Sequence, residues 1–153
     1  MAGDGVWITT GASRGIGAAI ARLAVDAGHN VALIARGESV MELAQSLGES
    51  AAGFQCDVAD PASVSEAVGA IVARFGRVEV LVNNAGVHRG GKIHRLTDEA
   101  WQEVLQVNLT GAMNMTRAAV PHMSEGCAVV HVGAVGFRGF PGDSAYASSK
   151  AGL

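Results

Sequence analysis

The sequence predicts an α/β fold in which helices cover both faces of a parallel, doubly wound sheet. Short apolar runs alternate with longer helix-like runs along the chain, and this alternation is typical of parallel strands joined by right-handed helical crossovers. A glycine-rich turn lies between the first apolar run and the first helix, with the sequence Thr10-Gly11-Ala12-Ser13-Arg14-Gly15-Ile16-Gly17. A turn of this kind after a strand and before a helix is typical of a phosphate-binding site.

Five strands and five helices are predicted. The strands span residues 6–9, 30–35, 53–56, 79–82 and 128–132, and the helices span residues 16–27, 38–47, 61–75, 97–123 and 144–153. The second strand is largely apolar, as expected for a strand buried on both faces. Asp60 is the predicted N-cap of the third helix, with Pro61 at the first helical position. Thr97 is the predicted N-cap of the long fourth helix.

The three glycines of the glycine-rich turn have separate expected roles. Gly11 suits the tight turn, Gly15 lets the backbone approach a pyrophosphate, and Gly17 lets the helix pack closely on the strand. The backbone N–H groups and the positive end of the first helix then face an anion.

Composition is typical of a single globular domain, residues 1–153. Charged residues make up 16% of the chain and hydrophobic residues 49%, against a usual charged share of about 25%. The net charge of −3 argues against nucleic-acid binding. No leader-like segment or membrane-length apolar run is seen, so we expect a cytoplasmic protein without a membrane partner.

The cysteines and histidines do not predict a metal site. Cys56 and Cys127 are far apart and form no C-x-x-C motif, so we expect two reduced, buried thiols. The five histidines show no metal-ligand spacing with cysteine or acidic residues, and Met113 and Met115 are expected in the core. The histidines are His29, His88, His94, His122 and His131.

Five motifs together resemble the classical short-chain dehydrogenase/reductase family, with 3-oxoacyl-acyl-carrier-protein reductases the most similar in appearance. They are the glycine-rich turn, Asn83-Asn84-Ala85-Gly86, Asp57-Val58, Asn108 within Val107-Asn108-Leu109-Thr110-Gly111, and Tyr146-Ala147-Ser148-Ser149-Lys150. The resemblance implies a Rossmann-type fold and hydride transfer to a ketone such as a 3-oxoacyl thioester. The substrate would be a small molecule or bound to an acyl carrier, and the full-length family form would be a homo-oligomer.

The resemblance also implies catalytic roles for Tyr146, Lys150 and Asn108. A phenol with a pKa near 10 is a poor acid–base group at neutral pH, and a neighbouring ammonium favours the phenolate. Tyr146 and Lys150 are four residues apart and share a helix face. Tyr146 would protonate the carbonyl oxygen, Lys150 would support it and hold the nicotinamide ribose, and Asn108 would hold a proton-relay water.

NADP(H) is the cofactor that the sequence favours. An acid at the end of the second strand would favour NAD, but that strand ends in Ala35-Arg36. The guanidinium groups of Arg14 and Arg36 suit a 2′-phosphate. By resemblance the full cofactor-binding set is Gly11, Ser13, Arg14, Gly15, Ile16, Gly17, Arg36, Asp57, Val58, Asn84, Ala85, Gly86, Tyr146 and Lys150.

The chain departs from the family pattern in two places. Gly133 stands thirteen residues before Tyr146, where the family has a serine that polarises the substrate carbonyl; either glycine replaces serine or one residue has been lost. The chain also supplies five strands of the six in a complete fold, so we expect a sheet that is incomplete at the C-terminus. Two alternatives therefore stay open, a non-catalytic dinucleotide-binding fragment and an interaction protein that uses the fold as a scaffold.

Overall fold

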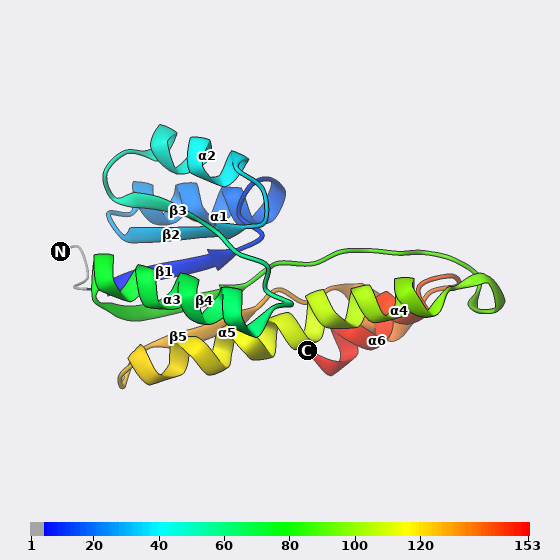
Figure 1. Ribbon diagram of the computed structural model, residues 1–153. Coiled ribbons are helices and arrows are strands. Elements are labelled where there is room, and N and C mark those ends of the chain that lie inside the picture. Colours follow the sequence, from blue (N-terminus) through cyan, green and yellow to red (C-terminus); the bar gives the residue numbers. More distant parts are fainter. Residues whose placement is uncertain (1–4) are drawn as a thin grey trace.

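The computed structural model describes residues 5–153 and contains a five-stranded parallel sheet (Figure 1). The strands lie in the order β3-β2-β1-β4-β5, with β1 in the centre. This order confirms the doubly wound α/β fold. Their bounds are β1 Gly5–Thr10, β2 Asn30–Ala35, β3 Ala51–Gln55, β4 Arg77–Asn83 and β5 Ala128–His131. Compared with the prediction, β1 and β4 are longer, β3 begins earlier, and Cys56 and Val132 lie just beyond their strands.

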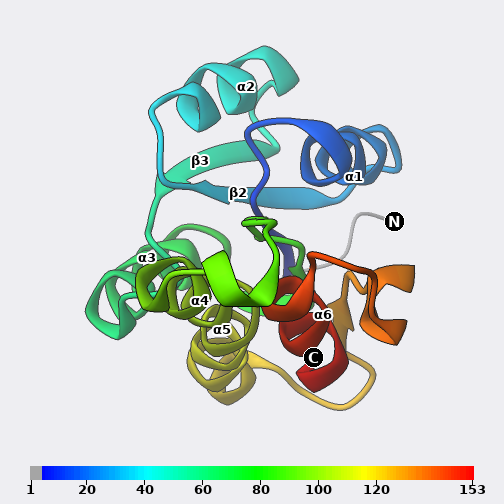
Figure 2. The same ribbon diagram turned by 90° about the vertical axis from the view of Figure 1, so that its right-hand side faces the viewer.

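Helices cover the two faces of the sheet unequally. α1 and α2 pack over β1, β2 and β3, whereas α3, α5 and α6 lie on the opposite face (Figure 2). The buried side chains divide into two clusters accordingly, with Leu33 and Val31 facing α1 and α2, and Ile8 and Ile34 facing α3. The helices are α1 Gly15–Asp26, α2 Ser39–Leu47, α3 Pro61–Phe75, α4 Asp98–Leu105, α5 Gly111–Ala119 and α6 Ser144–Gly152.

The helix caps follow the prediction. The Asp60 carboxylate accepts hydrogen bonds from the backbone N–H groups of Ala62 and Ser63, at 3.0 and 3.3 Å. The Thr97 hydroxyl accepts one from the N–H of Ala100 at 3.2 Å. Each cap satisfies donors that have no partner within the helix, and so each fixes where its helix begins.

The predicted long helix is not a regular α-helix. A π-helical segment, Gln106–Thr110, separates α4 from α5, and a short 3-10 helix, Val120–His122, follows α5. Asn108 lies in the π segment, whose wider turn is a common feature of functional sites. The sequence predicts both methionines in the core. Met115 is buried there, whereas Met113 is 47% exposed, because residues two apart on a helix point to different faces.

β5 is the least covered strand. Residues that are paired across neighbouring strands point to the same face of the sheet. Val130 is paired with Val82, and Val82 with Thr9, so the three side chains share one face. α1 and α2 cover that face over β1 to β3 and do not reach β5, which leaves Val130 47% exposed. Cys127, which precedes β5, is half-buried rather than buried, whereas Cys56 is buried as expected. In residues 5–153 no helix has the length and apolar character to span a membrane.

Candidate functional site

A cleft of about 630 Å³ opens at the carboxyl ends of β1, β2, β3 and β4. Parallel sheets of this type bind ligands where the strand order reverses, which here is between β1 and β4. The cleft therefore lies where the fold class places a ligand. Its walls are formed by Gly11, Ser13, Arg14, Gly15, Ile16, Ile34, Ala35, Arg36, Gly37, Ser39, Cys56, Asp57, Val58, Asn84, Ala85, Gly86, Val87 and Val107.

The glycines of the glycine-rich turn make close loop contacts possible. Gly11 has a φ of +63°, and a Cβ atom there would lie 2.9 Å from the Cα of Ala85. A Cβ at Gly17 would lie 2.5 Å from the carbonyl oxygen of Gly11 and 2.6 Å from Nδ2 of Asn84. Gly17 thus serves the contact between the helix and the turn, and it lies behind the cleft wall. Gly15, with a φ of +59°, faces open space.

The amino end of α1 borders the cleft. α1 begins at Gly15, with Arg14 in extended conformation before it, and its first turn contains no acidic residue. The free N–H groups of that turn and the helix dipole therefore present partial positive charge to the cleft without a competing carboxylate. The geometry suits an anionic phosphate group.

A hydrogen-bond network joins the glycine-rich turn to the motif after β4. The Thr10 hydroxyl accepts from the N–H groups of Asn84 and Ala85, at 3.0 and 2.9 Å, and donates to the carbonyl of Val82. The Asn84 amide donates to the carbonyl oxygens of Thr10 and Gly11. Sequence reasoning missed Thr10 as a positioning residue, because its partners are 72 to 75 residues away.

Two guanidinium groups border the cleft at the end where the family resemblance implies that adenosine would bind. Arg14 and Arg36 are exposed, and in the part of the chain that the structure describes neither pairs with a carboxylate. Asp57 also lines the cleft; one of its carboxylate oxygens accepts from the N–H of Ala59 at 2.9 Å. The net positive charge of the two arginines is thus available to a ligand.

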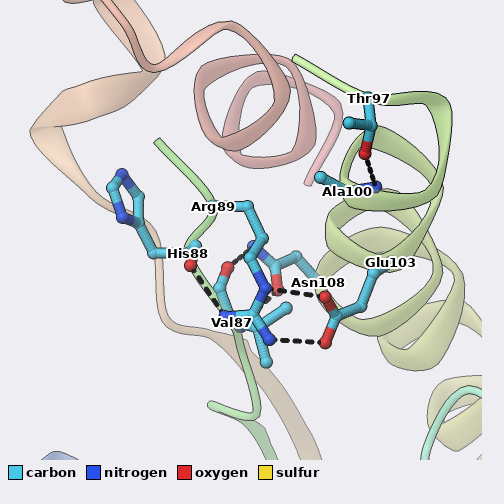
Figure 3. A network of polar contacts seen from close by, with 7 residues as sticks. All are labelled: Val87, His88, Arg89, Thr97, Ala100, Glu103 and Asn108. Atoms are coloured by element: carbon cyan, nitrogen blue, oxygen red, sulfur yellow. Dashed lines mark hydrogen bonds and ion pairs between the residues drawn. The ribbon is translucent and has the colours of Figure 1, made fainter. Parts of the chain in front are cut away.

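Asn108 ties the segment after β4 to α6. Its Oδ1 accepts from the N–H of Val87 at 2.7 Å, and its Nδ2 donates to the carbonyl of Val87 at 3.0 Å (Figure 3) and to the hydroxyl of Ser149 at 3.1 Å. The Ser149 hydroxyl donates in turn to the carbonyl of Tyr146. Ser149 was not singled out from the sequence, although its place three residues after Tyr146 puts it on a neighbouring part of the same helix.

Tyr146 and Lys150 lie on one face of α6, as the spacing predicts. Nζ of Lys150 is 5.9 Å from the centre of the Tyr146 ring and donates to the carbonyl of Val132 at 2.8 Å. Lys150 is buried, and this burial lowers the pKa of its amine from the usual 10.5 because it penalises the ammonium. Tyr146, Lys150 and Asn108 lie outside the walls of the cleft, and Asn108 contacts it through Val87.

Gly133 leaves an open space. A Cβ atom built there would have no atom within 4 Å among residues 5–153 apart from its own residue and the two chain neighbours, and the φ of Gly133 is not in the left-handed region. A serine could therefore replace this glycine without backbone strain. Within residues 5–153 no group of three or more histidine, cysteine or acidic side chains has metal-binding geometry.

Comparisons with known proteins agree with this geometry. The sequence pattern of the family described as short chain dehydrogenase matches residues 5–153. The 3-oxoacyl-(acyl-carrier-protein) reductase FabG of Staphylococcus aureus is 36% identical over 154 residues, and that of Salmonella typhimurium is 37% identical over 150 residues. Each alignment covers 95% of this chain, which spans 63% and 62% of the respective relatives.

Solved structures show the same likeness. An actinorhodin polyketide ketoreductase variant with NADPH superposes with a TM-score of 0.92 and 35% identity, covering 99% of this chain and 62% of that one. A short-chain dehydrogenase/reductase variant of Serratia marcescens superposes with a TM-score of 0.91 and 31% identity, with coverages of 96% and 63%.

The parallel sheet, with its glycine-lined cleft at the point of reversal, defines a Rossmann-type fold. Within that class, the chain belongs to the short-chain dehydrogenase family.

Proposed function

We propose that this chain binds NADP(H) and carries the residues for hydride transfer to a ketone, with a 3-oxoacyl thioester as the preferred substrate class. The observation that carries the proposal is the link between the phosphate-suited cleft and the helix of the Tyr146–Lys150 pair: Asn108 bonds both to Val87, in the cleft wall, and to Ser149, on α6. Arg14 and Arg36, which pair with no carboxylate within residues 5–153, border the same cleft. The relatives described above, a 3-oxoacyl-(acyl-carrier-protein) reductase and a polyketide ketoreductase with NADPH, support the same substrate class and cofactor.

Each residue has a part in the proposed reaction. The nicotinamide supplies a hydride when bound. Tyr146 gives a proton to the carbonyl oxygen as the hydride arrives, and the Lys150 ammonium favours the resulting phenolate. The side-chain amide of Asn108 bonds to Val87 and Ser149, and by resemblance this residue would hold a proton-relay water.

Cofactor preference tests the binding half of the proposal. Arg36→Asp should weaken NADPH binding by at least about tenfold and shift preference toward NADH, because it replaces a phosphate partner by a like charge. Isothermal titration with both nucleotides measures this. Arg22→Asp is the matched control, since Arg22 is exposed on α1 and is not part of the cleft wall. Equal affinity of the unmutated chain for NADPH and NADH would contradict the proposal.

A second candidate function is a dinucleotide-binding module without turnover, and Gly133 is the observation that favours it. Loss of one oxyanion-type donor costs about a hundred- to a thousandfold in rate, so we expect carbonyl reduction to be very weak. If glycine simply replaces serine, Gly133→Ser should raise turnover of a ketone panel by roughly two orders of magnitude. If a residue was lost, inserting serine after Gly133 should succeed where Gly133→Ser fails. NADPH binding with no turnover in all three chains would favour the module.

A further inference from the structure

Three groups surround the ring of Tyr146, the one tyrosine of the chain. Lys150 lies on the same helix, and the backbone at Gly136 is close enough that a Cβ there would lie 3.4 Å from Cε1 of the ring. The third group is His88, whose ring meets the tyrosine ring edge-on, with 5.1 Å between centres and 75° between planes. His88 comes from the segment after β4, so this contact joins two separate parts of the site.

His88 is itself held in place by Asp143. Its Nε2 lies 2.8 Å from Oδ1 of Asp143, a residue just before α6. A carboxylate can only accept, so Nε2 carries the hydrogen in this pair. The N–H of Gly91 donates to the carbonyl of Gly142 at 2.8 Å and joins the same two segments.

The backbone on both sides of His88 is also anchored. Val87 bonds to Asn108 in the π segment, and Arg89 makes a two-pronged ion pair with Glu103 of α4, at 2.7 and 2.8 Å. Figure 3 shows the His88 ring on the opposite side of this segment from the Arg89–Glu103 pair. A Cβ at Gly90 would lie 3.1 Å from Cε1 of His88, so the glycine lets the backbone approach the imidazole, whose other side is open to solvent at 52% exposure.

We propose that His88, oriented by Asp143, is a positioning residue for Tyr146 that holds the phenol ring edge-on. Edge-to-face contacts between aromatic rings are favourable in their own right, and an imidazole fixed by a carboxylate offers a rigid edge. The proposal rests on the proposed function for what Tyr146 does chemically. The placement of the ring is a separate matter, and it can be measured without turnover.

The test uses ring-labelled tyrosine and nuclear magnetic resonance, because a single tyrosine yields a single set of ring signals. Asp143 is the N-cap residue of α6, but its side chain makes no cap hydrogen bond and bonds to His88 instead, so Asp143→Ala removes a bond to the imidazole and none to the backbone of α6. We expect Asp143→Ala to shift the ring signals and to speed ring flipping by about two- to twelvefold, the change that matches loss of one aromatic contact. Asp26→Ala, at the exposed end of α1, is the matched control and should change neither.

His88→Phe keeps an aromatic edge but cannot bond to Asp143, and it provides a second measurement if Asp143→Ala fails to fold. Adding Asp143→Ala to His88→Phe should then cause no further change, because the two residues act as one unit. Ring signals and flip rates that equal those of the unmutated chain in both folded variants would overturn the proposal.

Kinetics separates this proposal from the proposed function. In a chain that reduces ketones, Asp143→Ala should lower kcat by about two- to twelvefold and leave the KM for NADPH unchanged, since His88 and Asp143 lie outside the cleft wall. An unchanged kcat would overturn the positioning role in catalysis. If the unmutated chain, Gly133→Ser and the chain with serine inserted after Gly133 all turn over no ketone, the proposed function fails, and the resonance data still decide whether His88 positions the ring.

Discussion

Thr9 and Thr10 are neighbours on β1 with the same side chain and opposite hydrogen-bonding situations. Both are buried. The Thr10 hydroxyl bonds to three backbone groups, whereas the Thr9 hydroxyl has no partner within the described part of the chain. Burial of a hydroxyl is unfavourable unless it is hydrogen-bonded, so the two positions should respond differently to the same substitution.

Thr10→Val should lower the free energy of unfolding by about 2–3 kcal/mol, because it leaves the N–H groups of Asn84 and Ala85 without their acceptor. Thr9→Val should be neutral or stabilising, since it removes an unpaired polar group of similar size. Urea unfolding followed by circular dichroism measures both values. Equal losses in the two variants would show that the Thr10 network does not stabilise the turn.

The stability contributed by Lys150 should depend on pH. Burial lowers the pKa of its amine in the folded state below the usual 10.5. At a pH between the folded pKa and 10.5 the unfolded chain therefore binds more protons than the folded chain, and the free energy of unfolding rises with pH. Lys150→Met removes this group. The unfolding free energy of the unmutated chain, minus that of Lys150→Met, should therefore increase between pH 7 and about pH 10.5. Urea titrations at the two pH values measure it, and a constant or falling difference would contradict the assignment.

At the scale of elements, the π segment and β5 differ most from a regular Rossmann-type pattern. The π segment places the Asn108 amide against Val87 and Ser149, so the irregularity joins α6 to the segment after β4. β5 pairs with β4 and presents exposed Val130 on the face that α1 and α2 leave open. Uncovered apolar surface beside an unpaired strand edge favours association.

We therefore expect the chain to form dimers or larger species at tens of micromolar. Val130→Lys should raise the monomer fraction, because a charge on an exposed strand opposes strand pairing. Met41→Lys, at an equally exposed position on α2, is the control and should have little effect. Analytical ultracentrifugation measures the distribution. A monodisperse monomer in the unmutated chain would contradict this expectation.

At the scale of the whole molecule, the cleft brings together residues from five separate segments of the sequence. Of the fourteen predicted cofactor-binding residues, Gly17, Tyr146 and Lys150 do not line the cleft. The eleven that line it are Gly11, Ser13, Arg14, Gly15, Ile16, Arg36, Asp57, Val58, Asn84, Ala85 and Gly86. This agreement follows from topology, since carboxyl ends of parallel strands meet at one edge of a sheet. The roles of these residues in binding and catalysis stay predictions.

Features that depend on neighbours within the chain were predictable from the sequence alone. These include the alternation of strands and helices, the caps at Asp60 and Thr97, and the glycine at the tight turn, Gly11, because a few adjacent residues set the backbone conformation at each. The family resemblance also came from local motifs. The sequence by itself therefore determined the fold class and the region that forms the cleft.

Other features were decided by the tertiary structure. Contacts between groups far apart in sequence decide which threonine of β1 is hydrogen-bonded, which methionine is buried and how much of Cys127 is exposed. They also decide that Asp143 reaches His88, which is 55 positions away along the chain. Hydrogen bonds and burial of this kind arise only after distant segments pack together. The sequence names the side chains, and the packing of sheet, π segment and α6 selects their partners.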